Sequence, residues 1–141
     1  LYTWWQQNRP DPGMCANGML AGLVAITAPC AFVSPLAALT IGAIAGVLVC
    51  WSVWFVEWKL KLDDPVGAIS VHGANGLWGM ISLGIFANGT YGDGLNGVKG
   101  MVTGLLYGDS SQFFAQLIGV TACFLFVFSL SFLFFKVSTK C

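Results

Sequence analysis

The sequence predicts an all-α fold, a polytopic membrane helix bundle with four transmembrane helices. Charged residues make up only 9% of the 141 residues, against about 25% in a typical globular protein, and hydrophobic residues reach 57%. The charges are confined to segments that lie between or outside four long apolar ones. Because six Lys and Arg balance six Asp and Glu, the net charge is zero, and no basic face is available for nucleic acid.

The four apolar segments have the length that a membrane helix needs. No charged residue occurs within residues 13–33, 36–56, 65–87 and 113–135. A helix crosses the hydrocarbon layer with about 20 mostly apolar residues, whereas a membrane strand alternates apolar and polar residues, and the last segment does not alternate. We therefore expect helices at about 13–33, 36–58, 65–87 and 113–135, with a loop over 88–112.

The first two expected helices contain pairs of glycines at helical spacing. Gly18 and Gly22 form a GxxxG pair in the first helix, and Gly42 and Gly46 form another in the second. Small residues let membrane helices approach closely where lipid supplies no hydrophobic drive for association. We therefore expect tight packing through these glycines.

Proline and tryptophan indicate where the first two helices end. Pro29 should bend the end of the first helix, because proline donates no backbone hydrogen bond. Tryptophan is enriched at the two surfaces of the membrane. Trp4 and Trp5 fit the end of a preceding helix. Three more tryptophans would anchor the cytoplasmic end of the second helix: Trp51, Trp54 and Trp58.

The start of the third helix is predicted from Asp63, Asp64 and Pro65. Proline is favoured at the first helical position, and acidic residues are favoured at the positive end of the helix dipole. Three glycines then recur at every third position: Gly73, Gly76 and Gly79. The fourth helix is instead rich in Phe and holds a single glycine, which indicates a broad surface facing lipid.

The distribution of Lys and Arg predicts the orientation of the bundle. One side of the membrane receives five of them: Arg9, Lys59, Lys61, Lys136 and Lys140; the other side receives Lys99 alone. Lys and Arg accumulate on the cytoplasmic side of membrane proteins, so we expect both termini in the cytoplasm and the loop 88–112 outside. The chain begins at Leu1 without a signal peptide pattern, and we expect it to be a piece of a longer protein.

Enzymatic, metal and cofactor chemistry is not indicated. The chain has a single histidine that could complete a metal site with its cysteines, and the cysteines form no CxxC pair. The five cysteines are widely scattered: Cys15, Cys30, Cys50, Cys123 and Cys141. No nucleophile–base pair, glycine-rich phosphate loop or carboxylate pair at a catalytic spacing occurs either. We therefore expect no catalytic residue, no metal site and no cofactor.

His72 is the one ionisable side chain within the four apolar segments. It lies seven residues beyond Pro65, roughly 10 Å along a helix and well inside the hydrocarbon layer. Polar groups at that depth are costly and usually mark a transport path, although a neutral histidine bonded to a neighbouring helix is the alternative. Four residues share its expected helix face and leave room for either a narrow lumen or a close helix: Ala68, Asn75, Gly76 and Gly79.

Two segments resemble the ammonium transporters of the Amt family, in its microbial branch. Residues 64–73, DPVGAISVHG, are similar to the family's signature, and residues 18–27, GMLAGLVAIT, are similar to the segment that precedes it. The two lie at the family's usual separation. The resemblance covers nearly the whole chain and implies the carboxy-terminal four helices of an eleven-helix protomer, in a family that assembles as homotrimers with one pore per subunit.

The resemblance also implies roles for five residues. His72 would be the second member of the family's twin-histidine pair, whose partner lies on an earlier helix. Thr27 would lie near the pore centre, unless its hydroxyl is bonded to its own helix. Asn17 would lie lower in the pore, unless it joins helices by hydrogen bonds. Ala68 and Val71 would line or back the lumen.

The function implied is transport of ammonium or ammonia across the plasma or inner membrane by a multi-pass protein whose C-terminus is cytoplasmic. An ammonium sensor with the same fold and a truncated remnant without transport are the alternatives. Membrane lipid, a second and third copy of the full-length chain and a possible cytoplasmic regulatory protein are the expected partners.

Overall fold

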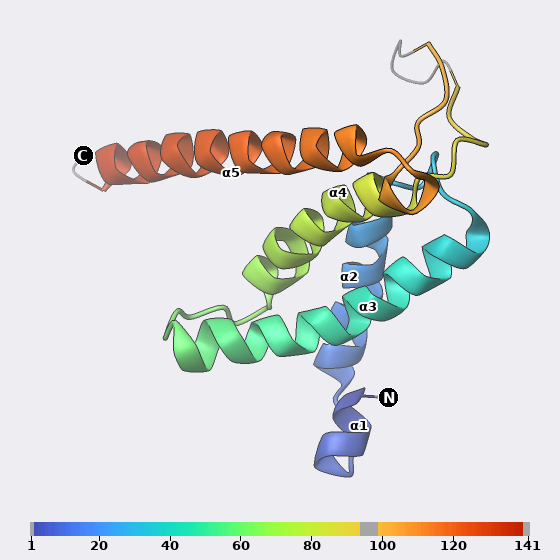
Figure 1. Ribbon diagram of the computed structural model, residues 1–141. Coiled ribbons are helices and arrows are strands. Elements are labelled where there is room, and N and C mark those ends of the chain that lie inside the picture. Colours follow the sequence, from blue (N-terminus) through green and yellow to red (C-terminus); the bar gives the residue numbers. More distant parts are fainter. Residues whose placement is uncertain (1, 94–98, 140–141) are drawn as a thin grey trace.

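The computed structural model of the chain describes residues 2–93 and 99–139. Within these residues its regular elements are all helices, with no named strand, and this confirms the all-α prediction (Figure 1). The α-helices are α1 Tyr2–Gln7, α2 Pro12–Thr27, α3 Pro35–Trp54, α4 Asn75–Phe86 and α5 Ser110–Ser138. Two π-helices, η1 Phe55–Lys59 and η2 Ile69–Ala74, and a 3-10 helix, η4 Leu105–Tyr107, complete the order.

Helix α2 is shorter than the expected helix over 13–33. The Asp11 side chain caps its start by accepting the N–H of Met14 at 3.1 Å. The helix ends at Thr27, and residues 28–33 form turns instead. Pro29 explains the early end, because it offers no N–H to the carbonyl of Ala25 and its ring crowds that carbonyl.

Helix α3 agrees closely with the expected helix over 36–58. Ser34 caps it by accepting the N–H of Ala37 at 3.3 Å, and η1 prolongs it to a continuous helix over Pro35–Lys59. Pro35–Lys59 and α5 are long and apolar enough to cross a membrane, whereas α2 is a shorter apolar helix. The Trp4 and Trp5 side chains lie exposed on the short helix α1.

The third helix begins later than the expected start at Pro65. Pro65 and Val66 form a turn, closed by the N–H of Gly67 and the carbonyl of Asp64 at 2.9 Å. Helical backbone then runs without a break from Ala68 through η2 and α4 to Phe86. At 1.5 Å per residue this segment is about 28 Å long, close to the thickness of the hydrocarbon layer of about 30 Å.

The core lies where α2, α3 and α4 meet. One buried cluster comprises Ala25, Val33, Ile41 and Ala45, and a second comprises Ala21, Val49 and Val71. Most of these side chains are small, which lets the helices approach closely. The indole N–H of Trp78 donates to the carbonyl of Ile41 at 3.2 Å and ties α4 to α3.

The prediction of close packing at the two GxxxG pairs is wrong for the described helices. A β-carbon built on any of these four glycines meets no atom within 4 Å. The close approaches occur on α4 instead, where a β-carbon on Gly79 would lie 2.6 Å from the carbonyl oxygen of Ala25. A β-carbon on Gly84 would lie 2.9 Å from the α-carbon of Phe113 at the start of α5.

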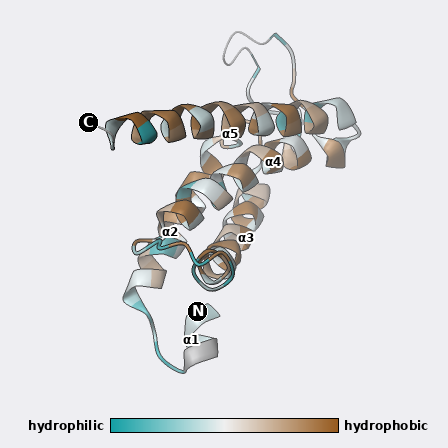
Figure 2. Ribbon diagram, turned by 90° about the vertical axis from the view of Figure 1, so that its left-hand side faces the viewer, coloured by the Kyte–Doolittle hydropathy of each residue, from teal (hydrophilic) through white to brown (hydrophobic). Residues whose placement is uncertain are grey.

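Helix α5 packs on α4 near its start and then extends away from the other helices (Figure 1). Every residue from Thr121 to Thr139 is exposed, and hydrophobic residues surround the helix (Figure 2). Contact of this surface with lipid stays a prediction. In the preceding connector, the N–H of Gly104 donates to the carbonyl of Ala87 at 2.8 Å and an antiparallel bridge pairs Asn88 with Thr103.

We expect Gly79→Ala to destabilise the protein, because the added methyl group would collide with the carbonyl of Ala25 on α2. Overpacking of this kind costs about 1–3 kcal/mol. Gly76→Ala is the matched control on the same helix, since nothing lies within 4 Å of its β-carbon position. The thermal midpoint of the purified protein in detergent measures both variants. Equal midpoints for the two would contradict the backbone contact.

We expect Ser111→Ala to raise the pKa of Asp109 towards its ordinary value. The Ser111 hydroxyl and backbone N–H donate to this carboxylate at 2.6 and 2.9 Å, which lowers its pKa. Because the folded pKa is the lower one, the contribution of the cap to stability is present above the unfolded pKa and is lost as pH falls through the folded pKa. Carbon-13 NMR titration of Asp109 measures the change, with Ser110→Ala as the control. If the pKa of Asp109 is the same in Ser111→Ala as in the wild type, the bonds from Ser111 do not lower it.

Candidate functional site

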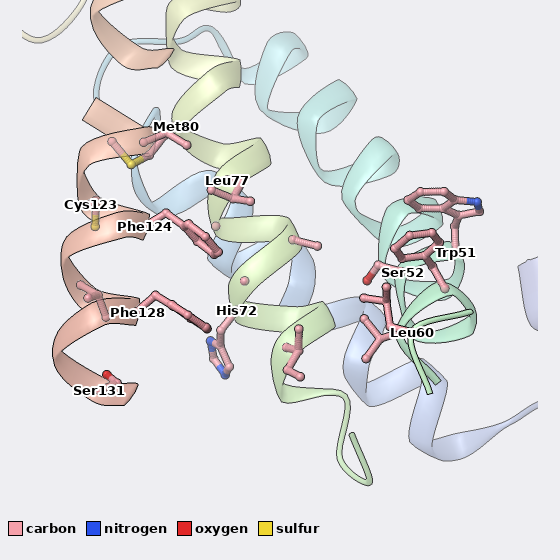
Figure 3. A pocket seen from close by; sticks show the side chains of 18 residues that line it. Trp51, Ser52, Leu60, His72, Leu77, Met80, Cys123, Phe124, Phe128 and Ser131 are labelled. Atoms are coloured by element: carbon pink, nitrogen blue, oxygen red, sulfur yellow. The ribbon is translucent and has the colours of Figure 1, made fainter. Parts of the chain in front are cut away.

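The candidate site is a groove of about 710 Å³ between the end of α3, the helix formed by η2 and α4, and α5 (Figure 3). Its lining is largely aliphatic and aromatic, including Trp51, Leu77, Phe124 and Phe128. The polar side chains in the lining are Ser52, His72, Cys123 and Ser131. The groove is therefore an apolar space with few polar groups.

His72 is presented to this groove by η2. Its side chain is exposed and, among the residues that the structure describes, no group forms a hydrogen bond with it. Phe124 and Phe128 extend from α5 towards the helix of His72 (Figure 3). Their rings stack on each other with centroids 5.8 Å apart. A neutral imidazole in such a space keeps both a donor and an acceptor available.

Asp64 fixes the start of the helix that carries His72. Its side chain is 4% exposed and accepts the N–H of Ile69 at 3.1 and 3.2 Å and that of Ser70 at 3.3 Å. The Ser70 hydroxyl also contacts it at 3.5 Å. A carboxylate at this end is favoured by the helix dipole as well as by these bonds. The continuous helix therefore begins at Ala68, four residues before His72, at a point set by the Asp64 side chain.

The prediction that four residues share one helix face with His72 is wrong in part. Gly76 lines the groove with His72, but Asn75 and Gly79 are buried outside it, and Gly79 meets α2. Ala68 is exposed outside the groove. The π-helix explains the difference, because an i→i+5 turn holds one more residue than an α-turn and shifts every position counted across it.

Val71 and Thr27 also lie outside the groove. Val71 is 2% exposed and packs with Ala21 and Val49, so it backs the helix of His72 from the core. Thr27 is the last residue of α2, and its hydroxyl donates to the carbonyl of Leu23 at 2.8 Å. In this structure the Thr27 hydroxyl is therefore bonded to its own helix, which is the alternative to a role in the pore.

Asn17 lines a second and smaller cavity of about 200 Å³. This cavity is more polar and is bordered by the carboxylates of Asp11, Glu57 and Asp64. A β-carbon on Gly67 would lie 2.7 Å from the amide nitrogen of Asn17, so glycine is needed at position 67, where φ is +70°. Asn17 thus contacts the turn that leads into η2 and joins two segments of the bundle.

Two buried polar residues near His72 were not predicted as site residues. The Ser52 hydroxyl and the Asn75 side-chain oxygen are buried without a hydrogen-bond partner in the described part of the chain. Ser52 gives no sequence signal, because serine is common in apolar helices. Asn75 does give one, since a second strongly polar residue follows His72 by three positions. No group of three His, Cys, Asp or Glu residues that could hold a metal ion occurs among the described residues.

The sequence matches the model of the Ammonium Transporter Family over residues 1–141. It is 49% identical over 139 residues to ammonium transporter Amt2 of Archaeoglobus fulgidus, which covers 98% of this chain and 29% of that protein. It is 34% identical over 137 residues to an ammonium transporter of Bacillus subtilis, covering 97% and 32%. With ammonium transporter 3 of Dictyostelium discoideum the identity is 38% over 120 residues, covering 84% and 27%. The chain spans less than a third of the length of these relatives.

We expect Asp64→Ala to lower the free energy of unfolding, because it removes the carboxylate that accepts the part-buried N–H of Ile69 and the buried N–H of Ser70. A lost bond to a charged group of this kind costs about 1.5–3 kcal/mol. Asp63→Ala is the control, since Asp63 is exposed and makes no hydrogen bond within the described residues. Chemical unfolding of the two variants compares them. A loss for Asp63→Ala as large as that for Asp64→Ala would contradict the assigned cap.

Proposed function

Because the chain belongs to the ammonium transporter family, we propose that it forms part of a membrane transporter that carries ammonium or ammonia through a narrow apolar pore. The observation that carries this proposal is His72, an ionisable side chain in an apolar groove with no hydrogen-bond partner among the described residues. At the depth expected for His72 in a membrane helix, a polar side chain without a structural bond is costly and usually marks a transport path.

The chemistry of the substrate explains why such a groove needs an imidazole. Ammonium is a small cation, and burying it as an isolated ion in an apolar space is prohibitive. The pore must therefore remove its proton or replace the hydrogen bonds of its water shell. A neutral imidazole both donates and accepts hydrogen bonds, and it exchanges a proton near neutral pH. Phe124 and Phe128 would keep water away from the exchanging nitrogen.

The groove supplies one wall of the proposed pore. His72 is the single histidine of the chain. We propose that the second histidine of the pair and the remaining walls come from residues outside these 141. Asn17 in the polar cavity and Thr27 at the end of α2 are the further polar candidates along the path. Ala68 and Val71 would shape the path from behind His72.

The chain is a membrane protein, and we propose a multi-pass arrangement in the cell membrane with both termini in the cytoplasm. Support comes from the five Lys and Arg on one side of the expected spans against Lys99 on the other. We also propose that the full-length protein assembles as a homotrimer. The residues of α5 after position 121 are exposed and mostly apolar, which suits contact with lipid or with another helix.

We expect His72→Ala in the full-length protein to abolish saturable ammonium uptake or to let hydrated cations through, because the imidazole is the group that exchanges the proton. Uptake of labelled methylammonium into proteoliposomes measures the first outcome, and potassium currents measure the second. Phe126→Ala is the control, since it truncates a ring of α5 that does not line the groove. Selective uptake at the wild-type rate by His72→Ala would overturn the role of His72. Binding of ammonium without any flux by the wild type would favour a sensor.

A further inference from the structure

Asn75 lies at the junction of η2 and α4 and is fully buried. Its side-chain amide donates to the carbonyl of Ser70 at 2.9 Å, and its backbone N–H donates to the carbonyl of His72. Since a carbonyl oxygen only accepts, the NH₂ group of the amide must be the part that faces Ser70. Asn75 is thus bonded to the backbone of His72 and to that of the residue two positions before it.

The bond to Ser70 crosses the π-turn from its end to its beginning. On the opposite side of the same residue, the N–H of Ser70 donates to the carboxylate of Asp64 at 3.3 Å. Ser70 is therefore held at its N–H by Asp64 and at its carbonyl by Asn75. In the sequence, His72 lies between Ser70 and Asn75, the two residues that this bond joins. A π-turn is rare, and where it interrupts an α-helix it is frequently found at a functional site.

The π-turn decides where His72 points relative to α4. Each residue of an α-helix turns the chain by about 100°, so conversion of the π-turn to an α-turn would rotate residue 72 by about that angle against Gly76, Leu77 and Met80. These three residues line the groove. The imidazole would then leave the groove, even though its position in the sequence is unchanged.

We propose that Asn75 is a positioning residue for His72, one that holds the π-turn and so aims the imidazole into the groove. This inference rests on the proposed transport function. An apolar residue of the same size would fill the same space in the core at no desolvation cost. The amide oxygen of Asn75 has no partner among the described residues, so packing alone does not account for an amide at this position.

Ser82 provides the matched comparison. It is also fully buried on the same continuous helix, and its hydroxyl donates to a carbonyl of its own chain, that of Gly79, at 2.7 Å. This bond spans an ordinary turn of α4 and does not touch η2 or the groove. A variant of Ser82 therefore measures the effect of losing a buried side-chain hydrogen bond in this helix, and a variant of Asn75 measures the effect of losing the bond across the π-turn.

The test compares Asn75→Leu, Asn75→Gln and Ser82→Ala in the full-length transporter, with wild type and His72→Ala in parallel. Initial rates of methylammonium uptake over a range of concentrations give the maximal rate per folded transporter in the membrane and the apparent KM. We expect Asn75→Leu to lower that maximal rate on the order of 10-fold or more, since small misplacements of a reacting group have large effects, with a smaller change in KM. Asn75→Gln, which retains an amide donor, should recover part of the loss, and Ser82→Ala should keep the wild-type rate.

The inference is overturned if Asn75→Leu transports at the wild-type rate per folded transporter, or if Ser82→Ala loses as much as Asn75→Leu. Should Asn75→Leu not accumulate in the membrane, Asn75→Ser decides by the same measurement, because its shorter side chain cannot reach the carbonyl of Ser70. A wild type without saturable uptake, or uptake that His72→Ala leaves unchanged, contradicts the proposed function instead. Uptake that depends on His72 but not on Asn75 contradicts this inference alone.

Discussion

The hydrogen bonds from the N–H groups of Ile69 and Ser70 to the Asp64 carboxylate are the contacts on which the arrangement around His72 depends. Inside a membrane every backbone polar group needs a partner within the protein, because no water is available. A helix that starts after an irregular turn must therefore find acceptors for its first N–H groups. Asp64 supplies them from five residues away, and in doing so it sets the register from which η2, His72 and α4 follow.

The helices themselves could be predicted well from the sequence, because hydrocarbon thickness and the absence of charge constrain their number and length. Their ends were less predictable. Pro29 ends α2 near Thr27 rather than bending a longer helix, and Pro65 belongs to a turn rather than to the first helical position. In both places one proline is compatible with two local structures, and the residue type alone does not decide between them.

The candidate site could be predicted as a single residue but not as a set. His72 stands out because a charge-bearing side chain in an apolar helix has few explanations. The prediction that Asn75 and Gly79 share the helix face of His72 was wrong, because it assumed 3.6 residues per turn through a segment that forms a π-helix. The prediction from the glycine pairs failed because GxxxG spacing shows where backbones can approach, not where they do, and the close approach lies between Gly79 and Ala25 instead.

The contact of Gly79 with the carbonyl of Ala25 has a consequence for the dynamics of the bundle. Two helices that touch backbone to backbone slide or rotate against each other only by breaking that contact, because no flexible side chain lies between them to adjust. Helices α2 and α4 should therefore move as one rigid body. Phe124 and Phe128 can instead move on the timescale of side-chain rotation, because their rings are exposed and stack along α5.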